Sequence, residues 1–286
     1  MKLVTYETGN GPRVGILDGE DVLDAGFDGD MVAFIEAHPN GASDKLSQAQ
    51  FRVEEPFRLL APLRPRSLRD FLTWEGHMRN ALSKLGRPVP QEWYEIPVYY
   101  KGLPDTVIGP GDTIPWPHYS DRLDHELELA AVIGRPGRDI EPEHALEHVF
   151  GWTLWNDLSA RDVQARELAV ALGPGKGKDW DGSNVLGPCI VTADELDGTN
   201  VELEVRVNGE RWGGDSTANM HHSFADLIAY ASMAETLHPG EVLGSGTATG
   251  GSGIELDRRL EPGDVVELEA EGVGVLRNTI GAKGAT

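Results

Sequence analysis

Hydrophobic and polar residues alternate in several short stretches of the chain, as in strands that bury one face. Residues 201–212, VELEVRVNGERW, alternate on both sides of an Asn-Gly pair, and this pattern predicts a β-hairpin. Residues 263–280 predict further strands, and so do two shorter runs near the start of the chain, 2–7 and 13–25. Strands therefore dominate the expected secondary structure.

Helical periodicity is confined to fewer segments. Residues 30–41, DMVAFIEAHPNG, begin with an Asp suited to a helix N-cap and end in Pro-Asn-Gly, which stops a helix. Helices are also expected within residues 142–151 and 223–237. The mixture predicts an α+β protein that is mainly β.

Residues 70–86, DFLTWEGHMRNALSKLG, place apolar side chains every three or four positions, which is the spacing of one helix face. These apolar residues are Phe71, Trp74, Met78, Ala81, Leu82 and Leu85. On a continuous helix, Asp70 and His77 would lie within about 20° of each other, at the edge of this face. The pattern therefore predicts that one helix carries both residues, although Gly76 weakens the helix locally.

The segment APLRPRS, residues 61–67, contains two prolines and is the expected domain boundary. Residues 1–62 are then expected to form a small N-terminal α+β domain, and residues 63–286 a larger second domain. A chain of 286 residues is long enough to give each part a hydrophobic core.

Charge narrows the range of partners. The chain has 25 basic and 47 acidic residues, a formal net charge of −22, and such a surface repels nucleic acid and anionic membranes. No run of residues approaches the roughly 18 apolar positions of a membrane span, and the start, MKLVTYETGNGPR, lacks the apolar region of a signal peptide. The single cysteine, Cys189, rules out an intrachain disulfide. We therefore expect a cytoplasmic protein; the acidity fits a salty cytoplasm or a GC-rich genome equally well.

Two glutamates sit unusually in the run LDHELELAAVIG, residues 123–134. Glu126 and Glu128 would point to the same face of a strand, roughly 6.5–7 Å apart, beside residues that enter the core. Asp157 follows an apolar run and is expected at the end of another buried strand. Such carboxylates repel each other unless a cation lies between them, and Mg²⁺ or Ca²⁺ prefers oxygen ligands of this kind. Alternatively, the glutamates lie on a solvated strand face and Asp157 caps the next helix.

Three motifs resemble the fumarylacetoacetate hydrolase superfamily when taken in order: LDHELELAAVIG, NDLSARDVQ and GPGKGKDWDGSNVLGP. The resemblance extends from about Asp70 to Asn278. Within the superfamily, the chain resembles a bacterial or archaeal member of the fumarylacetoacetase branch. It implies a mixed β-sandwich roll, usually a homodimer, that binds Mg²⁺ (or Ca²⁺ or Mn²⁺). It also implies that Glu126, Glu128 and Asp157 are metal ligands, with Asp70 as a fourth ligand.

A histidine and a distant glutamate match the catalytic pair of the same branch. His77 resembles the histidine that activates water, and Glu255, in GSGIELDRR, resembles the glutamate that orients it. Without the resemblance, His77 would be a structural or surface residue and Glu255 an ordinary strand-edge acid. Shorter relatives carry the glutamate three residues after the histidine, where this chain has Asn80, so the resemblance implies the long-range arrangement.

Lys178 follows a glycine-rich run that is not a phosphate loop, because the spacing is wrong and Asp179 stands where Ser or Thr should follow. The resemblance implies that Lys178 lies near the metal and stabilises negative charge. A solvated loop lysine is the simpler account of Lys176. Further positions resemble substrate contacts: Tyr100, Gln164 and Thr247.

Two motif residues, Arg161 and Asp162, are expected to be structural, as an ion pair that braces the metal-bearing strand. The fumarylacetoacetase branch includes a eukaryotic hydrolase of tyrosine degradation, and two pocket positions that carry tyrosine in that enzyme are Leu72 and Leu168 in this chain. Each lost hydroxyl removes a hydrogen bond worth roughly 0.5–1.5 kcal/mol. The substrate is therefore not expected to be fumarylacetoacetate itself.

These features together predict a catabolic, metal-dependent hydrolase that cleaves a carbon–carbon bond in a small 1,3-dicarbonyl or acylpyruvate-type acid. The bond would break with formation of an enolate, after His77 and Glu255 activate water. Two other reactions use the same metal site: decarboxylation of a 2-oxo acid and isomerisation of an unsaturated 2-oxo or 2-hydroxy acid. A non-catalytic, metal-stabilised binding protein is the alternative from another class.

Overall fold

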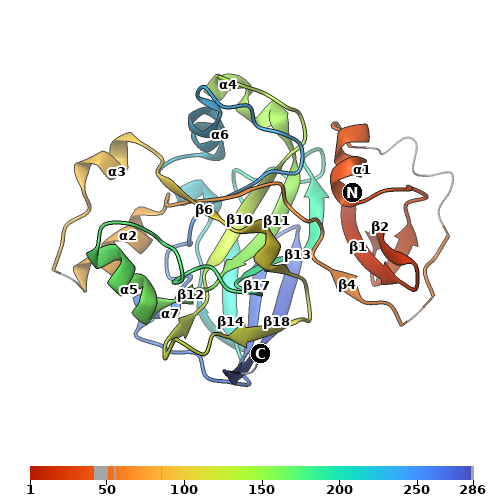
Figure 1. Cartoon of the computed structure of the whole chain (residues 1–286). Coiled ribbons are helices and arrows are strands. Elements are labelled where there is room, and N and C mark those ends of the chain that lie inside the picture. Colours follow the sequence, from red (N-terminus) through yellow and green to blue (C-terminus); the bar gives the residue numbers. More distant parts are fainter. Residues whose placement is uncertain (42–50, 55, 85, 285–286) are drawn as a thin grey trace.

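Two sheets make up most of the protein, and the longer one begins with strands from the N-terminus (Figure 1). The computed structural model describes residues 1–41, 51–54, 56–84 and 86–284. The longer sheet runs in the order β3 (Asp21–Asp24), β2 (Gly11–Asp18), β1 (Lys2–Thr8), β13 (Asn184–Thr192), β11 (Val149–Asp157), β10 (Leu127–Ile133), β16 (Val242–Gly244), β5 (Leu68–Phe71) and β6 (Tyr99–Gly102). Two short strands join it, β4 (Leu59–Leu60) on β1 and β7 (Val107–Ile108) on β13.

The second sheet has five strands and packs against the middle of the first, since β14, β17 and β18 contact β10, β11 and β13 respectively. Its order is β15 (Glu210–Gly213), β14 (Leu203–Val207), β17 (Val265–Ala270), β18 (Gly274–Lys283) and β8 (Thr113–Trp116). A separate short pair joins β12 (Ser159–Ala160) to β9 (Leu123–Asp124). The expected class, mixed α+β and mainly β, is confirmed.

The helices lie around the two sheets, and α4 and α6 pack side by side (Figure 1). They are α1 (Met31–Ala37), α2 (Glu75–Ser83), α3 (Gln91–Glu95), α4 (Pro142–Ala145), α5 (Arg161–Ala169), α6 (Phe224–Ser232) and α7 (Gly253–Leu256), with 3₁₀ turns at Pro104–Thr106, Leu146–His148 and Thr217–Asn219. Within the described residues, none of the helices is long and apolar enough to cross a membrane.

The central strand β10 is buried on both faces, and its two faces belong to different cores. Its odd-numbered residues, such as Leu129 and Ala131, join the core shared with the five-stranded sheet. Its even-numbered residues Ala130 and Val132 join a second core that includes Phe34 of α1. Because side chains alternate along a strand, Glu126 and Glu128 fall on the even face, at the end of this second core.

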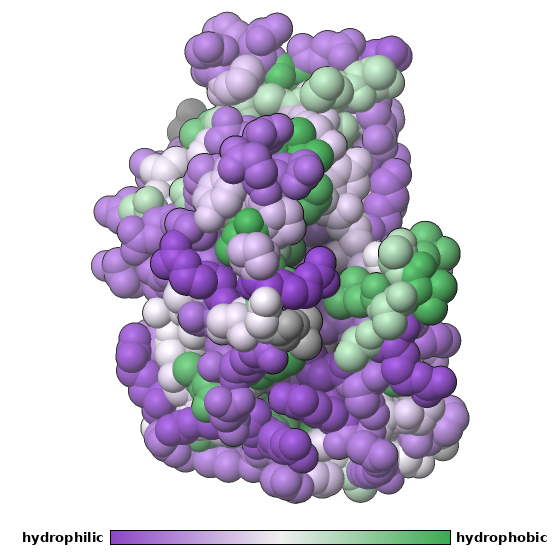
Figure 2. Space-filling view, turned by 90° about the vertical axis from the view of Figure 1, so that its left-hand side faces the viewer, coloured by the Kyte–Doolittle hydropathy of each residue, from purple (hydrophilic) through white to green (hydrophobic). Residues whose placement is uncertain are grey.

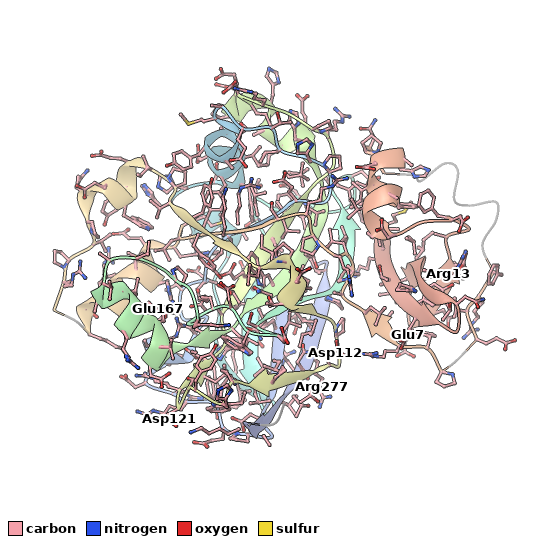
Figure 3. All side chains as sticks on the ribbon, viewed as in Figure 1. Glu7, Arg13, Asp112, Asp121, Glu167 and Arg277 are labelled. Carbon is pink, nitrogen blue, oxygen red and sulfur yellow. The ribbon has the colours of Figure 1, made fainter. Side chains whose placement is uncertain are left out.

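The strands at the start of the chain are hydrogen-bonded to the rest of the longer sheet, because β1 pairs antiparallel with β13. An exposed ion-pair group adds a second connection, because Arg58 contacts both Glu7 and Asp112. Figure 3 labels these two acids. The division of the chain at residue 62 stays a prediction.

Most elements expected from local patterns are confirmed. The Asn-Gly hairpin is formed by β14 and β15, with Asn208 and Gly209 at φ values of 52° and 78°, as a two-residue hairpin turn requires. The Asp30 side chain caps α1 by accepting the backbone N–H of Ala33. The segment 142–151 is helical only up to His148, because the apolar run that follows is recruited into β11.

The single helix expected over residues 70–86 is wrong. Asp70 lies on strand β5, which pairs with β16 and β6, and α2 begins only at Glu75. The linker stays extended because Thr73 Oγ1 and Trp74 Nε1 donate to backbone carbonyls of the loop after β16, at 2.6 and 2.9 Å. Tertiary hydrogen bonds thus override the helical spacing, and Leu85 lies outside the described residues.

Candidate metal centre and active site

Four carboxylates from three strands converge in the interior. They are Asp70, Glu126, Glu128 and Asp157, all buried, and each offers an oxygen within 4.8 Å of the others. The register of the sheet explains the convergence, because Leu127 faces Asn156 and so places Glu126 opposite Asp157. The predicted ligands are therefore in one place, with Asp70 reaching it from β5 rather than from a helix.

Gly244 makes the approach of Asp70 possible. It lies on β16, between Ala130 of β10 and Asp70 of β5 in the pairing register. A Cβ atom on Gly244 would lie only 2.5 Å from Glu128 Oε2 and 2.7 Å from the Trp155 ring. The missing side chain thus leaves room for the Glu128 carboxylate between the two strands.

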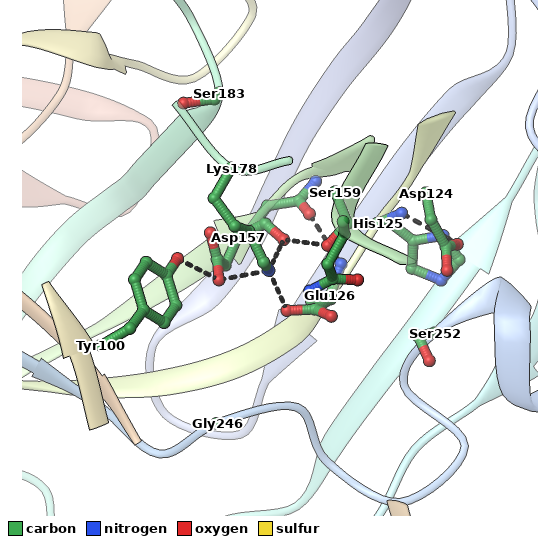
Figure 4. Close-up of polar contacts among 12 residues, drawn as sticks. Tyr100, Asp124, His125, Glu126, Asp157, Ser159, Lys178, Ser183, Gly246 and Ser252 are labelled. Carbon is green, nitrogen blue, oxygen red and sulfur yellow. Dashed lines mark hydrogen bonds and ion pairs between the residues drawn. The ribbon is translucent and has the colours of Figure 1, made fainter. Parts of the chain in front are cut away.

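Two buried cations contact the cluster, and Figure 4 shows the lysine between two of the acids. Lys178 Nζ donates to Glu126 Oε2 and to Asp157 Oδ2, both at 2.5 Å, and Arg161 Nη1 lies 2.7 Å from Glu126 Oε1. Tyr100 OH also donates to Asp157 Oδ2 at 2.6 Å. In the described part of the chain, two cations therefore face four carboxylates, and a divalent cation would balance the remainder.

Hydrogen bonding and pKa values support the same conclusion. Asp70 Oδ1, Asp157 Oδ1 and both Glu128 carboxylate oxygens are buried without a hydrogen-bond partner among the described residues. Burial, together with repulsion from neighbouring carboxylates, raises the pKa of Asp70 and of Glu128 well above the ordinary range. Burial also raises the pKa of Asp157, to about 6, against the opposing effect of Lys178.

Glu126 differs from its neighbours. Burial alone would raise its pKa, but Lys178 and Arg161 outweigh that effect and hold the pKa below the ordinary range. The cluster thus contains Glu126, which two cations stabilise, Asp157, which shares Lys178 with it, and two carboxylates, Asp70 and Glu128, that have no cationic partner among the described residues. An oxygen-only donor set with unpaired, buried oxygens fits a hard divalent cation such as Mg²⁺ or Ca²⁺.

His77 and Glu255, which are far apart in the sequence, lie side by side in the structure. His77 Nδ1 is 2.9 Å from Glu255 Oε2, and both side chains are buried. Glu255 also accepts hydrogen bonds from Gly250 N, Ser252 Oγ and Asn80 Nδ2 at 2.9 to 3.1 Å. Burial raises the pKa of Glu255, yet the His77 contact and these donors lower it overall, so this carboxylate is held as the anion.

The remaining predicted residues are placed as follows. Gln164 Oε1 accepts from Arg161 Nη1 at 3.1 Å, and Thr247 is buried in the loop after β16. Lys176 is exposed and donates to a backbone carbonyl, unlike the buried Lys178. Leu168 is exposed on α5, with 58% of its surface accessible.

The expected ion pair between Arg161 and Asp162 is wrong. Arg161 points inward, where its Nε donates to Asp124 Oδ2 at 2.8 Å and its Nη1 contacts Glu126. Asp162 accepts instead from Ser120 Oγ at 2.6 Å and from Asp121 N at 2.9 Å. The burial of the metal-bearing strand explains the difference, because a buried carboxylate attracts the guanidinium more strongly than a partly exposed neighbour does.

Sequence reasoning missed Asp124 and Gly244. Asp124 is part of the LDHELE motif and has the spacing of a strand residue on the same face as Glu126, so its position was a usable signal. Gly244 carried no local signal, because its role depends on two neighbouring strands.

Comparison with known proteins agrees with this geometry. A family model described as fumarylacetoacetate (FAA) hydrolase C-terminal matches residues 68–281. An oxaloacetate tautomerase of Bacillus subtilis is 31% identical over 242 residues, which cover 84% of this chain and 78% of that protein.

Solved structures show the same fold over nearly the whole chain. The fumarylacetoacetate hydrolase of psychrophilic Exiguobacterium antarcticum is 30% identical, with a TM-score of 0.82 and 99% of each chain covered. The 5-carboxymethyl-2-hydroxymuconate delta-isomerase of Mycobacterium smegmatis is 28% identical, with a TM-score of 0.76, and the match covers 98% of this chain and 99% of that one. The family match and the conserved architecture together show that the chain belongs to the fumarylacetoacetate hydrolase superfamily of enzymes, which includes hydrolases, isomerases and tautomerases.

Proposed function

We propose that this protein is a divalent-metal-dependent hydrolase that cleaves a carbon–carbon bond in a small 1,3-dicarbonyl or acylpyruvate-type acid. The observation that carries this proposal is the His77–Glu255 contact of 2.9 Å beside the four-carboxylate cluster. Asp70, Glu126, Glu128 and Asp157 would hold Mg²⁺, or Ca²⁺ or Mn²⁺ in its place. When bound, the metal would supply Lewis acidity and a binding point for substrate oxygens.

His77 is the proposed general base. A proton on His77 Nδ1 would face the Glu255 carboxylate, 2.9 Å away, and this tautomer would leave Nε2 free to accept a proton from water. The negative charge of Glu255 also stabilises the imidazolium that forms when water gives up its proton. Glu255 is well suited to this role because three other donors hold it in place.

Lys178 is the proposed stabiliser of the leaving group. Cleavage of the carbon–carbon bond leaves the electron pair on an enolate, and a buried ammonium is effective next to such a charge because little water competes with it. Gln164, Tyr100 and Thr247 are proposed to contact the substrate. Of these, Tyr100 already donates to the Asp157 carboxylate at 2.6 Å.

The proposal is tested with a panel of acylpyruvates, β-diketo acids and oxaloacetate in the presence of Mg²⁺ or Mn²⁺. Hydrolysis is followed by loss of enol absorbance and by identification of two acid products. The same panel reports decarboxylation by released CO₂. Cleavage of at least one acylpyruvate or β-diketo acid, lost on addition of a chelator, is the expected result.

Tautomerisation or isomerisation is a second candidate, because the similar protein of Bacillus subtilis is an oxaloacetate tautomerase and a similar solved structure is an isomerase. These reactions move a proton between carbon and oxygen or between two carbons, so they need no attacking water. Keto–enol exchange of oxaloacetate without any cleaved product would favour this candidate over hydrolysis.

We further propose that the protein works in the cytoplasm as a homodimer. Figure 2 shows a hydrophobic protrusion on a largely hydrophilic face, and the large exposed apolar residues at the end of α5 and just after it are Leu168, Val170 and Leu172, accessible by 58, 77 and 81%. An exposed apolar patch of this kind is typical of a protein interface. The two packed sheets are proposed to form the β-sandwich roll. Residues 1–62 are proposed to form a small domain, and limited proteolysis that cuts between residues 61 and 67 would support this boundary.

A further inference from the structure

Asp124 is a buried carboxylate outside the four-acid cluster, and Figure 4 shows it next to His125. Its hydrogen bonds reach both halves of the site. Its Oδ2 accepts from Arg161 Nε at 2.8 Å and from Ile254 N at 3.0 Å. Its Oδ1 accepts from Gly253 N at 2.9 Å. One carboxylate is therefore shared between a guanidinium and the first turn of α7.

On one side, Arg161 connects Asp124 to the metal-binding residues. The Arg161 Nη1 atom lies 2.7 Å from Glu126 Oε1 and 3.1 Å from Gln164 Oε1. A guanidinium is planar and makes directed hydrogen bonds, so fixing its Nε also fixes the direction of Nη1. Asp124 thus orients the group that holds Glu126 and Gln164.

On the other side, the backbone contacts place α7, which has only four residues and cannot hold its own position. The fit is close, because a Cβ atom on Gly253 would lie 2.7 Å from Asp124 Oδ1. The same turn carries Glu255, whose Oε2 is 2.9 Å from His77 Nδ1. The position of Asp124 therefore influences the position of Glu255, and through it the proposed general base His77.

We propose that Asp124 is a positioning residue that couples the metal-ligand half of the site to the His77–Glu255 pair. It contacts neither the proposed base nor the metal cluster directly, and it acts through Arg161 and through the start of α7. Its effect on hydrolysis rests on the proposed function, but its effect on His77 does not. If the residue were only structural, its loss would lower stability and leave His77 in the same surroundings.

The test variant is Asp124→Asn, which keeps the size of the side chain. Its amide nitrogen is a donor and would face other donors, namely Arg161 Nε or a backbone N–H of α7, so at least one contact is lost. The matched control is Asp24→Asn. Asp24 is also buried and accepts from Arg13 Nε at 2.6 Å and from Gly26 N at 2.7 Å, but it lies in the N-terminal strands. Figure 3 shows Arg13 on the opposite side of the molecule from Glu167 of α5.

The first measurement is the ¹⁵N resonance of the His77 ring in the Mg²⁺-loaded protein without substrate, assigned by its loss in His77→Gln. Asp124→Asn should move this resonance toward its position in Glu255→Gln, and Asp24→Asn should leave it unchanged. A second variant guards against misfolding: Gly253→Ala keeps Asp124 but displaces the start of α7, and it should move the resonance in the same direction. An unmoved His77 resonance in folded Asp124→Asn overturns the proposal, whether or not a hydrolysis substrate has been found.

The second measurement uses the best substrate of the panel. Asp124→Asn should lower kcat about 10–100-fold with KM changed by less than about threefold, since a misplacement of 1 Å is costly. The double variant Asp124→Asn/Glu255→Gln should be no slower than Glu255→Gln alone. Independent, multiplicative losses would overturn the coupling, while failure of wild type to hydrolyse any substrate would count against the proposed function only.

Discussion

Glu126 and Asp157 lie opposite each other on antiparallel strands, and a single ammonium group, that of Lys178, contacts both carboxylates at 2.5 Å. Glu126 has a second cationic partner in Arg161, whereas Glu128, two residues along the same strand, has none among the described residues. The site is therefore electrostatically uneven. The carboxylates nearest the lysine are neutralised, and Asp70 and Glu128 depend on a cation that the described part of the chain does not supply.

This unevenness predicts how Glu128→Gln behaves with and without metal. In chelator the variant should be more stable than wild type at neutral pH, because burial and the neighbouring carboxylates raise the pKa of Glu128, and the variant avoids the free-energy cost of burying a charge or taking up a proton on folding. Adding Mg²⁺ should raise the melting temperature of wild type but not of the variant. The measurement is thermal unfolding with and without Mg²⁺, supported by calorimetry.

A surface variant provides the control. Glu210→Gln, at an exposed ion pair with Arg258, should keep the Mg²⁺-dependent rise in melting temperature. Stoichiometric Mg²⁺ binding by Glu128→Gln in calorimetry would exclude Glu128 as a ligand.

Local sequence patterns predicted strands and helices well where neighbours along the chain decide the structure. Examples are the Asn208–Gly209 turn, the cap at Asp30, and the pair Glu126 and Glu128, which lie just before and within β10. The patterns failed where partners are distant in sequence. Asp70 was expected on a helix because the apolar spacing after it is helical, but pairing with β16 decides its conformation. The Arg161–Asp124 contact was missed for the same reason, since no local spacing reports which buried acid a guanidinium will reach.

Acid should destabilise the N-terminal strands through Asp24. Hydrogen bonds from Arg13 and Tyr6, acting against burial, lower the pKa of Asp24 to about 2, from 3.8. A depressed folded-state pKa contributes stability above the unfolded value, and this contribution is lost as pH falls from about 4 toward 2. It amounts to about 2 kcal/mol. Wild type should therefore lose free energy of unfolding over this range, by urea titration, more steeply than Asp24→Asn.

The comparison with Asp24→Asn isolates one residue from the many other carboxylates that titrate in the same range. Parallel curves for the two proteins between pH 4 and pH 2 would show that the Arg13–Asp24 contact contributes nothing to stability.

The charge of −22 predicts that folding depends on salt. Repulsion among surface acids is screened as the Debye length falls from about 10 Å at 0.1 M to about 3 Å at 1 M salt. The melting temperature should rise with KCl between about 0.05 and 1 M. A flat or falling curve would mean that surface ion pairs such as Arg58–Asp112, which salt weakens, balance the repulsion.

The apolar patch after α5 predicts the oligomeric state. The double variant Val170→Asp/Leu172→Asp should shift the protein from dimer to monomer in size-exclusion chromatography with light scattering, because it places charge in the proposed interface. Met233→Asp changes another exposed apolar residue, 64% accessible and located after α6, and should leave the dimer intact. A monomeric wild-type protein, or an unchanged dimer in the double variant, would count against this interface.

The chemistry of the site is tested most directly at His77. If water must be deprotonated, His77→Gln should slow hydrolysis by about 10²–10⁴-fold while Mg²⁺ binding is kept. Glu255→Gln should act in the same direction, because the carboxylate orients the imidazole at 2.9 Å and stabilises its positive charge. The two effects should not multiply in the double variant, since the residues act as one unit. Exchange of substrate α-protons with D₂O should fall much less, because enolisation needs no activated water.

An exposed histidine, His118, provides the control for this experiment, and His118→Gln should leave every rate unchanged. A merely structural His77 makes a different prediction: a lower melting temperature and similar losses in hydrolysis and in proton exchange. If His77→Gln hydrolyses its best substrate at nearly the wild-type rate, His77 is not the base. The tautomerase or isomerase function would then account better for the site, since a proton shift on a chelated oxo acid can proceed with Lys178 and the metal ligands alone.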